Sequence, residues 1–374
     1  MAAPLLVIAA GGTGGHMFPA QALAEEMLVR GWRVKLATDA RGARYADGFP
    51  PAVERQVTAA ASFAQGGPLA KLAAPFAIGW GALASLIALW RDRPACVAGF
   101  GGYPTLPAML AASTLKVPRL IHEQNGVLGR VNRVFAPRVE AVVCGVWPTP
   151  LPEGARAFHL GNPVREAVLA QADATYIPPG EHPVSVLVIG GSQGAGLFAR
   201  ILPQAVALLP HAMRTRLRLA QQVRPEDMAR AQDAYAGIGV DAELRGFFED
   251  VPARLAEATL VISRAGAGSI ADITVIGRPA ILIPYPYATD DHQAANAAGL
   301  VAAGGAFMIR DEALTAEGLA GHVAAILSDP EGASAMAEAS RRQGRPDATI
   351  ELAELVERLA AGKARIAAPK EERA

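Results

Sequence analysis

The stretch TLVISRAGAGSIADITVIGRPAILIPYPYATDDHQAAN, residues 259–296, indicates the fold class. Its apolar run 260–262 predicts a buried strand, and the small polar turn 263–269 that follows opens a helix. A second apolar run, 280–283, completes a strand–helix–strand unit. Strands that alternate with helices in this way are typical of a parallel α/β sheet.

Polar groups gather after both strands of this unit. The first backbone N–H groups of the helix have no partner inside it and carry a partial positive charge, so they suit a phosphate or a sugar hydroxyl. The second strand is followed by a turn at Asp290-Asp291 and then by His292, Gln293 and Asn296. Open α/β sheets bind ligands beyond the carboxyl ends of their strands, so we expect a ligand site here. An ordinary crossover without a ligand is the alternative.

Length and composition favour a two-domain protein without bulk charge. A chain of 374 residues with 51% hydrophobic content can bury two cores. Its 35 basic and 35 acidic residues balance, so no overall field argues for nucleic acid. Cys96 and Cys144 form neither a metal spacing nor a disulfide framework, which favours a reducing compartment. The N-terminus lacks a basic region and is interpreted as a first strand rather than a signal peptide.

The chain opens with the same order of elements. A predicted strand at Leu5–Ala10 leads into the turn GGTGGH, residues 11–16, and then a helix from about 18 to 30. Glycines let the backbone approach a ligand closely, and the helix start offers N–H groups to an anion.

A dinucleotide-binding fold is an alternative for this opening. The next predicted strand, 33–38, ends at Asp39, roughly where such folds place an acidic residue. However, the fingerprint GxGxxG is not met, because the sixth position from Gly12 is Met17. This mismatch disfavours nicotinamide or flavin binding.

Two further polar turns follow predicted strands of the same sheet. The strand 95–98 precedes GFGGYPT, residues 99–105, and the strand 117–121 precedes HEQNG, residues 122–126. Together with residues 11–16 they lie at one edge of the sheet, because carboxyl ends of parallel strands meet there. Their agreement favours a ligand-binding function over packing alone.

The second half of the chain repeats the opening pattern. Prolines at 178, 179 and 183 loosen the chain before a strand at 184–189, the turn GGSQG at 190–194 and a helix to about 209. This echo predicts two Rossmann-like, doubly wound parallel-sheet domains whose glycine turns face one cleft.

Residues 72–90 contain no charged side chain and are long enough to cross a bilayer. Pro75 and two glycines weaken that signal, and the segment lies within a strand–helix series, so we predict a crossover helix. Two interpretations remain open. The helix is buried, or it exposes an apolar face edged by cations that suits anionic lipid headgroups. That face would consist of Phe76, Trp80, Leu83 and Ile87, with Lys71, Arg91 and Arg93 at its ends.

Six ordered motifs carry a resemblance to a known family. They are GGTGGH, GFGGYPT, HEQNG, GNPVR at 161–165, GGSQGA at 190–195 and the stretch 259–296. Their order resembles that of family 28 of the GT-B glycosyltransferases, in particular the members that act on the lipid-linked muramyl-pentapeptide precursor of peptidoglycan, and covers nearly the whole chain. The resemblance implies an acceptor and membrane-facing domain at 1–162, a UDP-sugar-binding domain at 163–341, and a C-terminal helix, about 342–374, that packs back on the first domain.

The resemblance also implies an activity. It is the inverting transfer of N-acetylglucosamine from UDP-N-acetylglucosamine to the C4 hydroxyl of the muramyl sugar of lipid I, which gives lipid II in peptidoglycan synthesis. The implied place is the cytoplasmic face of the bacterial inner membrane, on an anionic surface, with partners in a cell-wall or division complex. No cofactor or metal is expected. A UDP-N-acetylglucosamine epimerase of the same fold and a nucleotide-binding regulator without catalytic activity are the alternatives.

Site residues are implied by position within the motifs. Ser192 would meet the donor diphosphate, Arg165 the nucleotide and the Phe248 backbone the uracil, while Gln293 and Asn125 would meet the sugar. The acceptor diphosphate would be held by Gly14, Gly15, Gly101, Gly102 and Tyr103. Further implied substrate-binding positions are Thr13, Gly14, Gly15, Ala267, Gly268, Ser269, Ile270, Ala271 and Asp272.

Two positions depart from the family pattern. Asp272 stands where a glutamate usually meets the ribose, and His292-Gln293 replaces a Gln-Gln pair. The shorter side chain of Asp272 puts the ribose contact in doubt.

The catalytic base must reach the acceptor hydroxyl. His16 ends the first glycine turn, and a helix N-terminus should favour its neutral, proton-accepting form. His122 and Glu123, on another turn at the same edge, are the competing candidates, and a purely binding role for His16 is the alternative.

Overall fold

The computed structural model describes residues 3–12, 14–57 and 68–362, and within them all side chains except those of Tyr45, 68–78 and 191–195. The chain forms two compact units. Unit 1 comprises Met1–Arg165 and Asp347–Ala374, and unit 2 comprises Glu166–Pro346. Each is built on one parallel sheet flanked by helices, so the predicted α/β fold class is confirmed.

Unit 1 contains a sheet with the strand order β3-β2-β1-β4-β5-β6-β7. The strands are β1 Leu5–Ala10, β2 Arg33–Thr38, β3 Glu54–Val57, β4 Cys96–Gly101, β5 Arg119–Glu123, β6 Ala141–Cys144 and β7 Ala157–His159. The central strands β1 and β4 are buried along their whole length, which explains their continuous apolar sequence. Cys96 and Cys144 are free and buried, and burial raises the pKa of both thiols to about 12.

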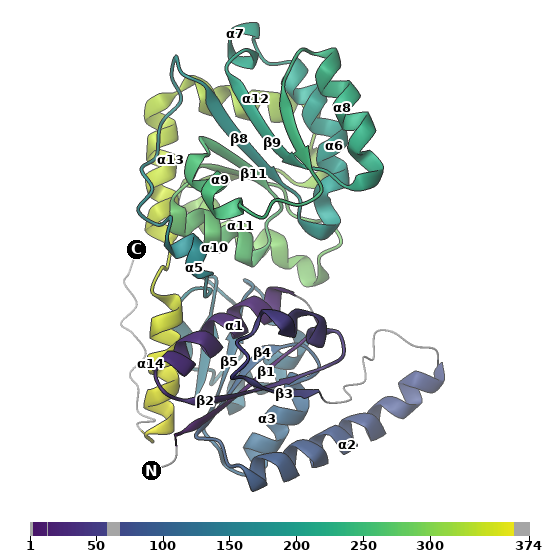
Figure 1. Ribbon diagram of the computed structural model, residues 1–374, viewed down its shortest axis with the longest axis vertical. Coiled ribbons are helices and arrows are strands. Elements are labelled where there is room, and N and C mark those ends of the chain that lie inside the picture. The colour runs from purple at the N-terminus through teal and green to yellow at the C-terminus, as the bar shows by residue number, and fades with distance from the viewer. Residues whose placement is uncertain (1–2, 13, 58–67, 363–374) are drawn as a thin grey trace. The chain divides into compact units, whose positions relative to one another are not determined.

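The C-terminal helix packs on the first helix of unit 1 (Figure 1). Unit 1 contains α1 Gly14–Val29, α2 Pro68–Arg91, α3 Thr105–Thr114, α4 Arg130–Phe135, α14 Ala348–Ala360, and the 3-10 helices η1 Gly42–Gly48 and η2 Ala136–Arg138. Leu352, Leu355 and Val356 of α14 join the same hydrophobic core as α1. An ion pair between Arg30 Nη1 and Glu357 Oε2, 2.8 Å long, adds a polar contact at the edge of this packing.

Helix α2 packs on α3 and extends along the periphery of unit 1 (Figure 1). Ser85 and Leu89 are buried, whereas the opposite face carries the exposed side chains of Trp80, Leu83, Ile87 and Trp90. The partly exposed alternative for this segment therefore matches its described part, and the side chains of Lys71 and Phe76 lie outside the described residues. Across the described parts of the chain, no helix combines the length and the hydropathy needed to cross a membrane.

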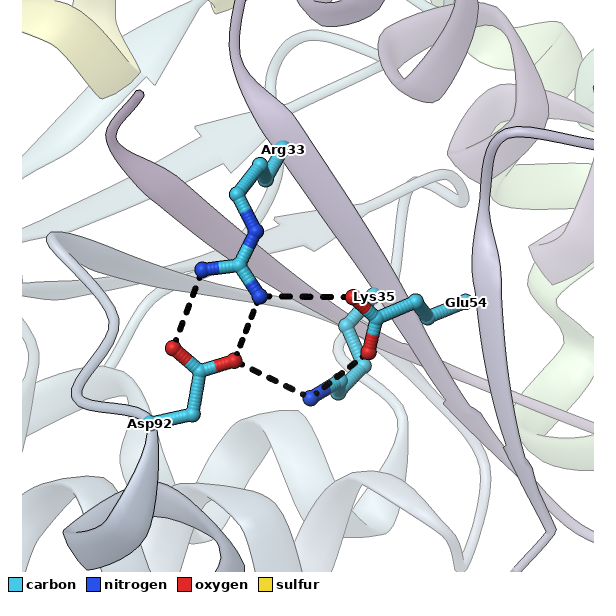
Figure 2. Close-up of polar contacts among 4 residues, drawn as sticks. All are labelled: Arg33, Lys35, Glu54 and Asp92. Carbon is cyan, nitrogen blue, oxygen red and sulfur yellow. Dashed lines mark hydrogen bonds and ion pairs between the residues drawn. The ribbon is translucent and has the colours of Figure 1, made fainter. Parts of the chain in front are cut away.

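A polar network connects the C-terminal end of α2 to the sheet (Figure 2). The Arg33 guanidinium donates to both carboxylate oxygens of Asp92, at 3.1 and 2.7 Å, and Lys35 Nζ lies 3.0 Å from Glu54 Oε2. Lys35 holds the pKa of Glu54 below its usual value, and Arg33 does the same for Asp92. Each pair is partly exposed and contributes little to stability, but the network fixes where α2 ends relative to β2 and β3.

Unit 2 contains a second parallel sheet with the order β10-β9-β8-β11-β12-β13. Its strands are β8 Val184–Ile189, β9 Leu217–Gln222, β10 Ala242–Arg245, β11 Leu260–Ser263, β12 Ala280–Leu282 and β13 Ala306–Met308. Its helices are α5 Glu166–Leu169, α6 Gly191–Ala207, α7 His211–Arg214, α8 Met228–Gly237, α9 Val251–Glu257, α10 Ala267–Ile276, α11 His292–Ala302, α12 Ala316–Ser328 and α13 Pro330–Gln343, with the 3-10 helices η3 Pro225–Asp227, η4 Thr289–Asp291 and η5 Asp311–Ala313. The predicted strand–helix–strand unit is β11, α10 and β12, and the two strands are direct parallel neighbours.

Both glycine-rich turns are shorter than the sequence predicts. The helix expected from about residue 18 begins at Gly14, and the helix expected after residue 194 begins at Gly191. Both starts are predicted too late because glycine has a low helix propensity, so the glycines are assigned to the turns and not to the helices. Pro19 consequently lies in the second turn of α1 rather than in its first. α6 thus begins two residues after β8 ends and α1 begins four residues after β1 ends, so His16 and Ser192 belong to the first helical turns.

Candidate active site

The turns after β1 and β4 pack directly against each other. A Cβ atom at Gly102 would lie 2.6 Å from the Gly11 carbonyl oxygen, and one at Gly11 would lie 2.5 Å from Pro104 Cγ. Gly102 also has a φ of +81°, which residues with side chains rarely adopt. The first turn of α1, with Gly14 and Gly15, and the turn of Gly101, Gly102 and Tyr103 are therefore brought to one edge of the sheet.

His16 lies in the first turn of α1 with a defined tautomer. Its Nδ1 is 2.8 Å from the Gly11 carbonyl oxygen, and because a carbonyl only accepts hydrogen bonds, Nδ1 carries the proton. In the neutral ring the lone pair is then on Nε2, which would lie 3.2 Å from a Cβ atom at Gly101. The basic nitrogen of His16 is thus directed toward the second glycine turn. Thr13, the neighbouring predicted position, lies outside the described residues.

His122 and Glu123 are buried residues of β5, so the prediction that they belong to the turn after this strand is wrong. His122 Nε2 lies 3.2 Å from the Gly161 carbonyl oxygen, its Nδ1 lies 3.1 Å from Gln124 Nε2, and the ring stacks on Phe100. Burial lowers the pKa of His122 to about 4. The strand continues through these polar residues because each finds hydrogen-bond partners inside the unit.

Glu123 organises the loop that follows β5. Its Oε1 accepts from the backbone N–H of Asn125 at 3.1 Å, and its Oε2 accepts from the Gly129 N–H at 2.8 Å and from Asn132 Nδ2 at 2.9 Å. The Asn125 side-chain amide also donates to Oε1, at 3.3 Å. The predicted sugar contact Asn125 is therefore held in place by a buried carboxylate.

Asp39, the residue that suggested a dinucleotide fold, closes its own turn. Its Oδ1 accepts from the Gly42 N–H at 2.7 Å, and its Oδ2 lies 3.6 Å from Arg41 Nε. Only 5% of the residue is exposed. The Asp39 carboxylate therefore stabilises its own turn by accepting a hydrogen bond within it, which argues against a contact with ribose.

In unit 2 the starts of α6 and α10 follow the neighbouring strands β8 and β11. Gly190 precedes α6 and Gly266 caps α10, while the side chain of Ser192 lies outside the described residues. In α10, Ala267 and Ile270 are buried, whereas Gly268 is exposed and Ser269, Ala271 and Asp272 are half-buried. Within residues 3–12, 14–57 and 68–362, no group of three or more potential metal-ligating side chains was found.

Gln293 and Phe248 lie beyond the ends of β12 and β10. The Gln293 side-chain oxygen accepts from the Tyr285 backbone N–H at 2.8 Å, which orients its amide nitrogen away from that contact. Asn296, one helical turn later, donates to the Ala265 carbonyl at 3.1 Å and so connects α11 to the turn before α10. Phe248 is buried, and Arg165 is exposed at the end of unit 1.

Arg264 has a role at this edge that the sequence did not predict. It is only 6% exposed, donates to the carbonyl oxygens of Ile283 and Pro284, and pairs with Asp311. Its guanidinium carbon lies 5.6 Å from the Tyr285 ring centroid. Arg264 thus joins the turn after β11 to the chain after β12. An arginine at the end of an apolar run gives no signal that its partners lie 19, 20 and 47 residues later.

Comparison with family models matches both units. Residues 6–144 match the model described as the glycosyltransferase family 28 N-terminal domain, and residues 185–352 match that of the family 28 C-terminal domain.

Individual relatives match almost the whole chain. The chain is 48% identical, over 97% of both chains, to a protein of Chelativorans sp. named UDP-N-acetylglucosamine–N-acetylmuramyl-(pentapeptide) pyrophosphoryl-undecaprenol N-acetylglucosamine transferase. A protein of the same name from Paramagnetospirillum magneticum is 47% identical over 94% of this chain and 96% of its own. Among solved structures, MurG of Acinetobacter baumannii is similar, with a TM-score of 0.78, 27% identity, and coverage of 95% of this chain and 99% of that one.

Proposed function

The chain belongs to glycosyltransferase family 28, and from that premise we propose that it transfers N-acetylglucosamine from UDP-N-acetylglucosamine to the lipid-linked muramyl-pentapeptide, converting lipid I to lipid II in peptidoglycan synthesis. The observation that carries the proposal is the 48% identity over 97% of both chains to a relative named for this transfer. The enzyme is therefore an N-acetylglucosaminyltransferase.

Each unit has its own substrate in this proposal. The donor binds unit 2, with uracil on the Phe248 backbone, ribose on Asp272, sugar on Gln293 and the diphosphate at the helix starts that carry Ser192 and Gly268. Helix N-termini suit a diphosphate because their free N–H groups and partial positive charge meet the anion.

The acceptor binds unit 1 in this proposal. Its diphosphate meets the backbone of Gly14, Gly15, Gly101 and Gly102, with Tyr103 beside them. The close packing of the two glycine turns supports this assignment, since it leaves backbone rather than side chains at the edge.

The chemical step requires a base at the acceptor hydroxyl. The C4 hydroxyl oxygen of the muramyl sugar attacks the anomeric carbon while His16 Nε2 takes its proton. The bond between the anomeric carbon and the diphosphate oxygen breaks, and UDP leaves with the electron pair. Attack opposite the leaving group inverts the configuration. The tautomer of His16 supports this role, whereas His122 and Glu123 are buried and hydrogen-bonded within the unit.

Labelled UDP-N-acetylglucosamine tests the activity. With purified lipid-linked acceptor, we expect label in the lipid product and release of UDP. Without acceptor, we expect unchanged donor. Epimerisation of the sugar without acceptor would contradict the proposal in favour of an epimerase, and donor that binds but stays unchanged with acceptor present would indicate a regulator.

We further propose that unit 1 binds the cytoplasmic face of the membrane through α2. Trp80 and Trp90 are each 72% exposed and lie with Leu83 and Ile87 on one face, next to Arg91 and Arg93. An apolar helix face with adjacent cations suits an anionic lipid surface.

Vesicles containing an anionic lipid test this surface. Serine at both Trp80 and Leu83 should lower vesicle affinity by at least about tenfold, since burying one such side chain contributes roughly 1.5–3 kcal/mol. Thermal stability should change little, because both side chains are exposed. Ile177→Ser, at an exposed position in unit 2, is the control. A large loss of stability, or unchanged vesicle binding, would contradict the proposal.

A further inference from the structure

The turn at Gly246–Asp250 is held by a side-chain network that the proposed reaction does not yet use. This turn joins β10 to α9 and carries Phe248. Arg254, in the second turn of α9, reaches back across it. Its guanidinium carbon lies 4.3 Å from the centroid of the buried Phe248 ring.

The guanidinium of Arg254 is fixed by two carboxylates on opposite sides of the turn. Nη1 and Nη2 donate to the two oxygens of Glu243 in β10, at 2.7 and 3.0 Å. Nε donates to Asp250 Oδ1 at the start of α9, at 2.8 Å. The pKa of Glu243 and that of Asp250 are both lowered by these hydrogen bonds with Arg254. Paired donation to one carboxylate fixes the orientation of a guanidinium as well as its position.

The main chain of the turn is therefore restrained from several directions. Gln222 Nε2 donates to the Gly246 carbonyl at 3.2 Å, and the Val223 N–H donates to the Arg245 carbonyl at 2.9 Å. Arg254 restrains the other end through the Phe248 ring and Asp250. Among the residues that the structure describes, none hydrogen-bonds to the backbone of Phe248. Its N–H and carbonyl are thus held in place by the turn without a backbone partner of their own among the described residues.

We propose that Arg254 is a positioning residue for recognition of the donor nucleobase: with Glu243 it holds the Phe248 backbone where its N–H and carbonyl meet the edge of uracil. The inference rests on the proposed use of a UDP-sugar. Uracil presents an N–H donor beside a carbonyl acceptor, which match a peptide carbonyl and N–H. Cytosine presents the opposite pattern, so a fixed peptide edge discriminates between the two bases.

Calorimetric binding of UDP and CDP provides the test. In the wild type, UDP should bind more tightly than CDP. In Arg254→Met, the ratio of the two affinities should fall by roughly tenfold or more, since a displaced contact group loses its advantage for the matching ligand. The KM for UDP-N-acetylglucosamine should rise while kcat at saturation stays close to that of the wild type.

Two further variants separate positioning from folding. Arg254→Lys keeps a cation near the Phe248 ring but cannot donate in parallel to Glu243, so its base preference should lie between those of wild type and Arg254→Met. Glu243→Gln should also weaken the preference for UDP, so it replaces Arg254→Met in the test if that variant is too unstable to measure. Arg342→Met removes an arginine paired with Glu338 in α13 and should leave the UDP to CDP ratio unchanged.

The outcomes distinguish the inference from the function on which it rests. If wild type prefers UDP and folded Arg254 and Glu243 variants keep that preference in full, the positioning role is overturned and the proposed function stands. If wild type binds UDP no better than CDP, both fail. A merely structural role for Arg254 would lower the affinity for both nucleotides equally, which also overturns the inference.

Discussion

Gly102 in unit 1 and Gly268 in unit 2 both follow a parallel strand, yet a side chain at the two positions would meet different surroundings. A Cβ atom at Gly102 would lie 2.6 Å from a backbone oxygen, whereas one at Gly268 would have no heavy atom within 4 Å. The same contrast extends to Gly11 and Gly99 in unit 1, where a Cβ atom would approach neighbouring side chains to 2.5 and 2.7 Å.

The contrast separates two reasons for glycine at a sheet edge. In unit 1 the turns pack on each other, so glycine is required by the fold itself. In unit 2 a Cβ atom at Gly268 would meet nothing, so packing does not require glycine there, and we propose that it permits close approach of a ligand to the backbone. The edge of unit 1 also contains His16 and the buried His122. We therefore expect changes in unit 1 to affect catalysis and stability, and changes in unit 2 to affect donor binding.

The largest expected effect is that of His16→Ala. If Nε2 is the base, kcat should fall by roughly 10² to 10⁴-fold, the usual contribution of general base catalysis. Donor affinity should change little, because the donor binds unit 2 in our proposal. Steady-state kinetics with both substrates and calorimetry with UDP check this prediction.

His211→Ala is the control for His16→Ala, because His211 is exposed in α7 of unit 2 and should be dispensable. A loss confined to the KM of the acceptor would make His16 a binding residue. A loss of UDP affinity would contradict the assignment of donor binding to unit 2.

The next effect is the pH dependence of unit 1. The pKa of His122 is lowered by burial to about 4, so the folded unit keeps it neutral where the unfolded chain protonates it. Stability should therefore be lost as the pH falls from about 6.5 toward 4, by up to about 3 kcal/mol from this group. Above pH 6.5 the group contributes no pH dependence.

Tryptophan fluorescence can follow this loss selectively, because the four tryptophans, Trp32, Trp80, Trp90 and Trp147, are all in unit 1. In His122→Gln, the unfolding free energy of unit 1 should depend less on pH between 6.5 and 4 than in the wild type. Identical pH profiles for the two proteins would show that His122 is not held neutral.

The sequence predicted the architecture better than the contacts. The strands Leu5–Ala10, Arg33–Thr38 and Val184–Ile189 have the predicted bounds, because their apolar runs coincide with buried strands. The meeting of the turns followed from the parallel order of strands. The burial of His122 and Glu123 did not, because a polar pair after an apolar run is typical of a turn. Their partners, such as Gly161 and Asn132, lie well apart in the sequence.

The bridge from Arg254 to Glu243 was also outside the reach of the sequence. It spans eleven residues across a strand, a turn and a helix, a separation that no local pattern marks. The first stretch of unit 1 ends at Arg165. Helix α14 belongs to the same unit because side chains such as Leu352 pack into its core.

In unit 2, Asp272 tests whether the open edge binds the donor ribose. Asp272 lies four residues after Gly268, on the same face of α10. Asp272→Ala should weaken donor binding by roughly 1–3 kcal/mol, the cost of leaving a polar partner unsatisfied. Asp272→Glu should preserve or improve it, since the longer side chain shortens the contact. Calorimetry with UDP-N-acetylglucosamine measures both, and unchanged binding in Asp272→Ala would refute the ribose assignment.

The smallest effect on stability, and the sharpest test of the contrast, comes from alanine at the two glycines. Gly102→Ala introduces both a clash with the Gly11 carbonyl and a strained positive φ, so unfolding of unit 1 should become easier by about 1–3 kcal/mol. Gly268→Ala introduces neither, and it replaces glycine within a helix. Its unfolding free energy should stay constant or rise by about 0.4–1 kcal/mol, chiefly because alanine reduces the entropy of the unfolded chain. If the donor approaches the backbone here, the same methyl group should nevertheless weaken UDP-N-acetylglucosamine binding. A variant that is more stable but binds donor less well would assign Gly268 to the ligand, whereas unchanged binding would leave the glycine without a role in the donor site.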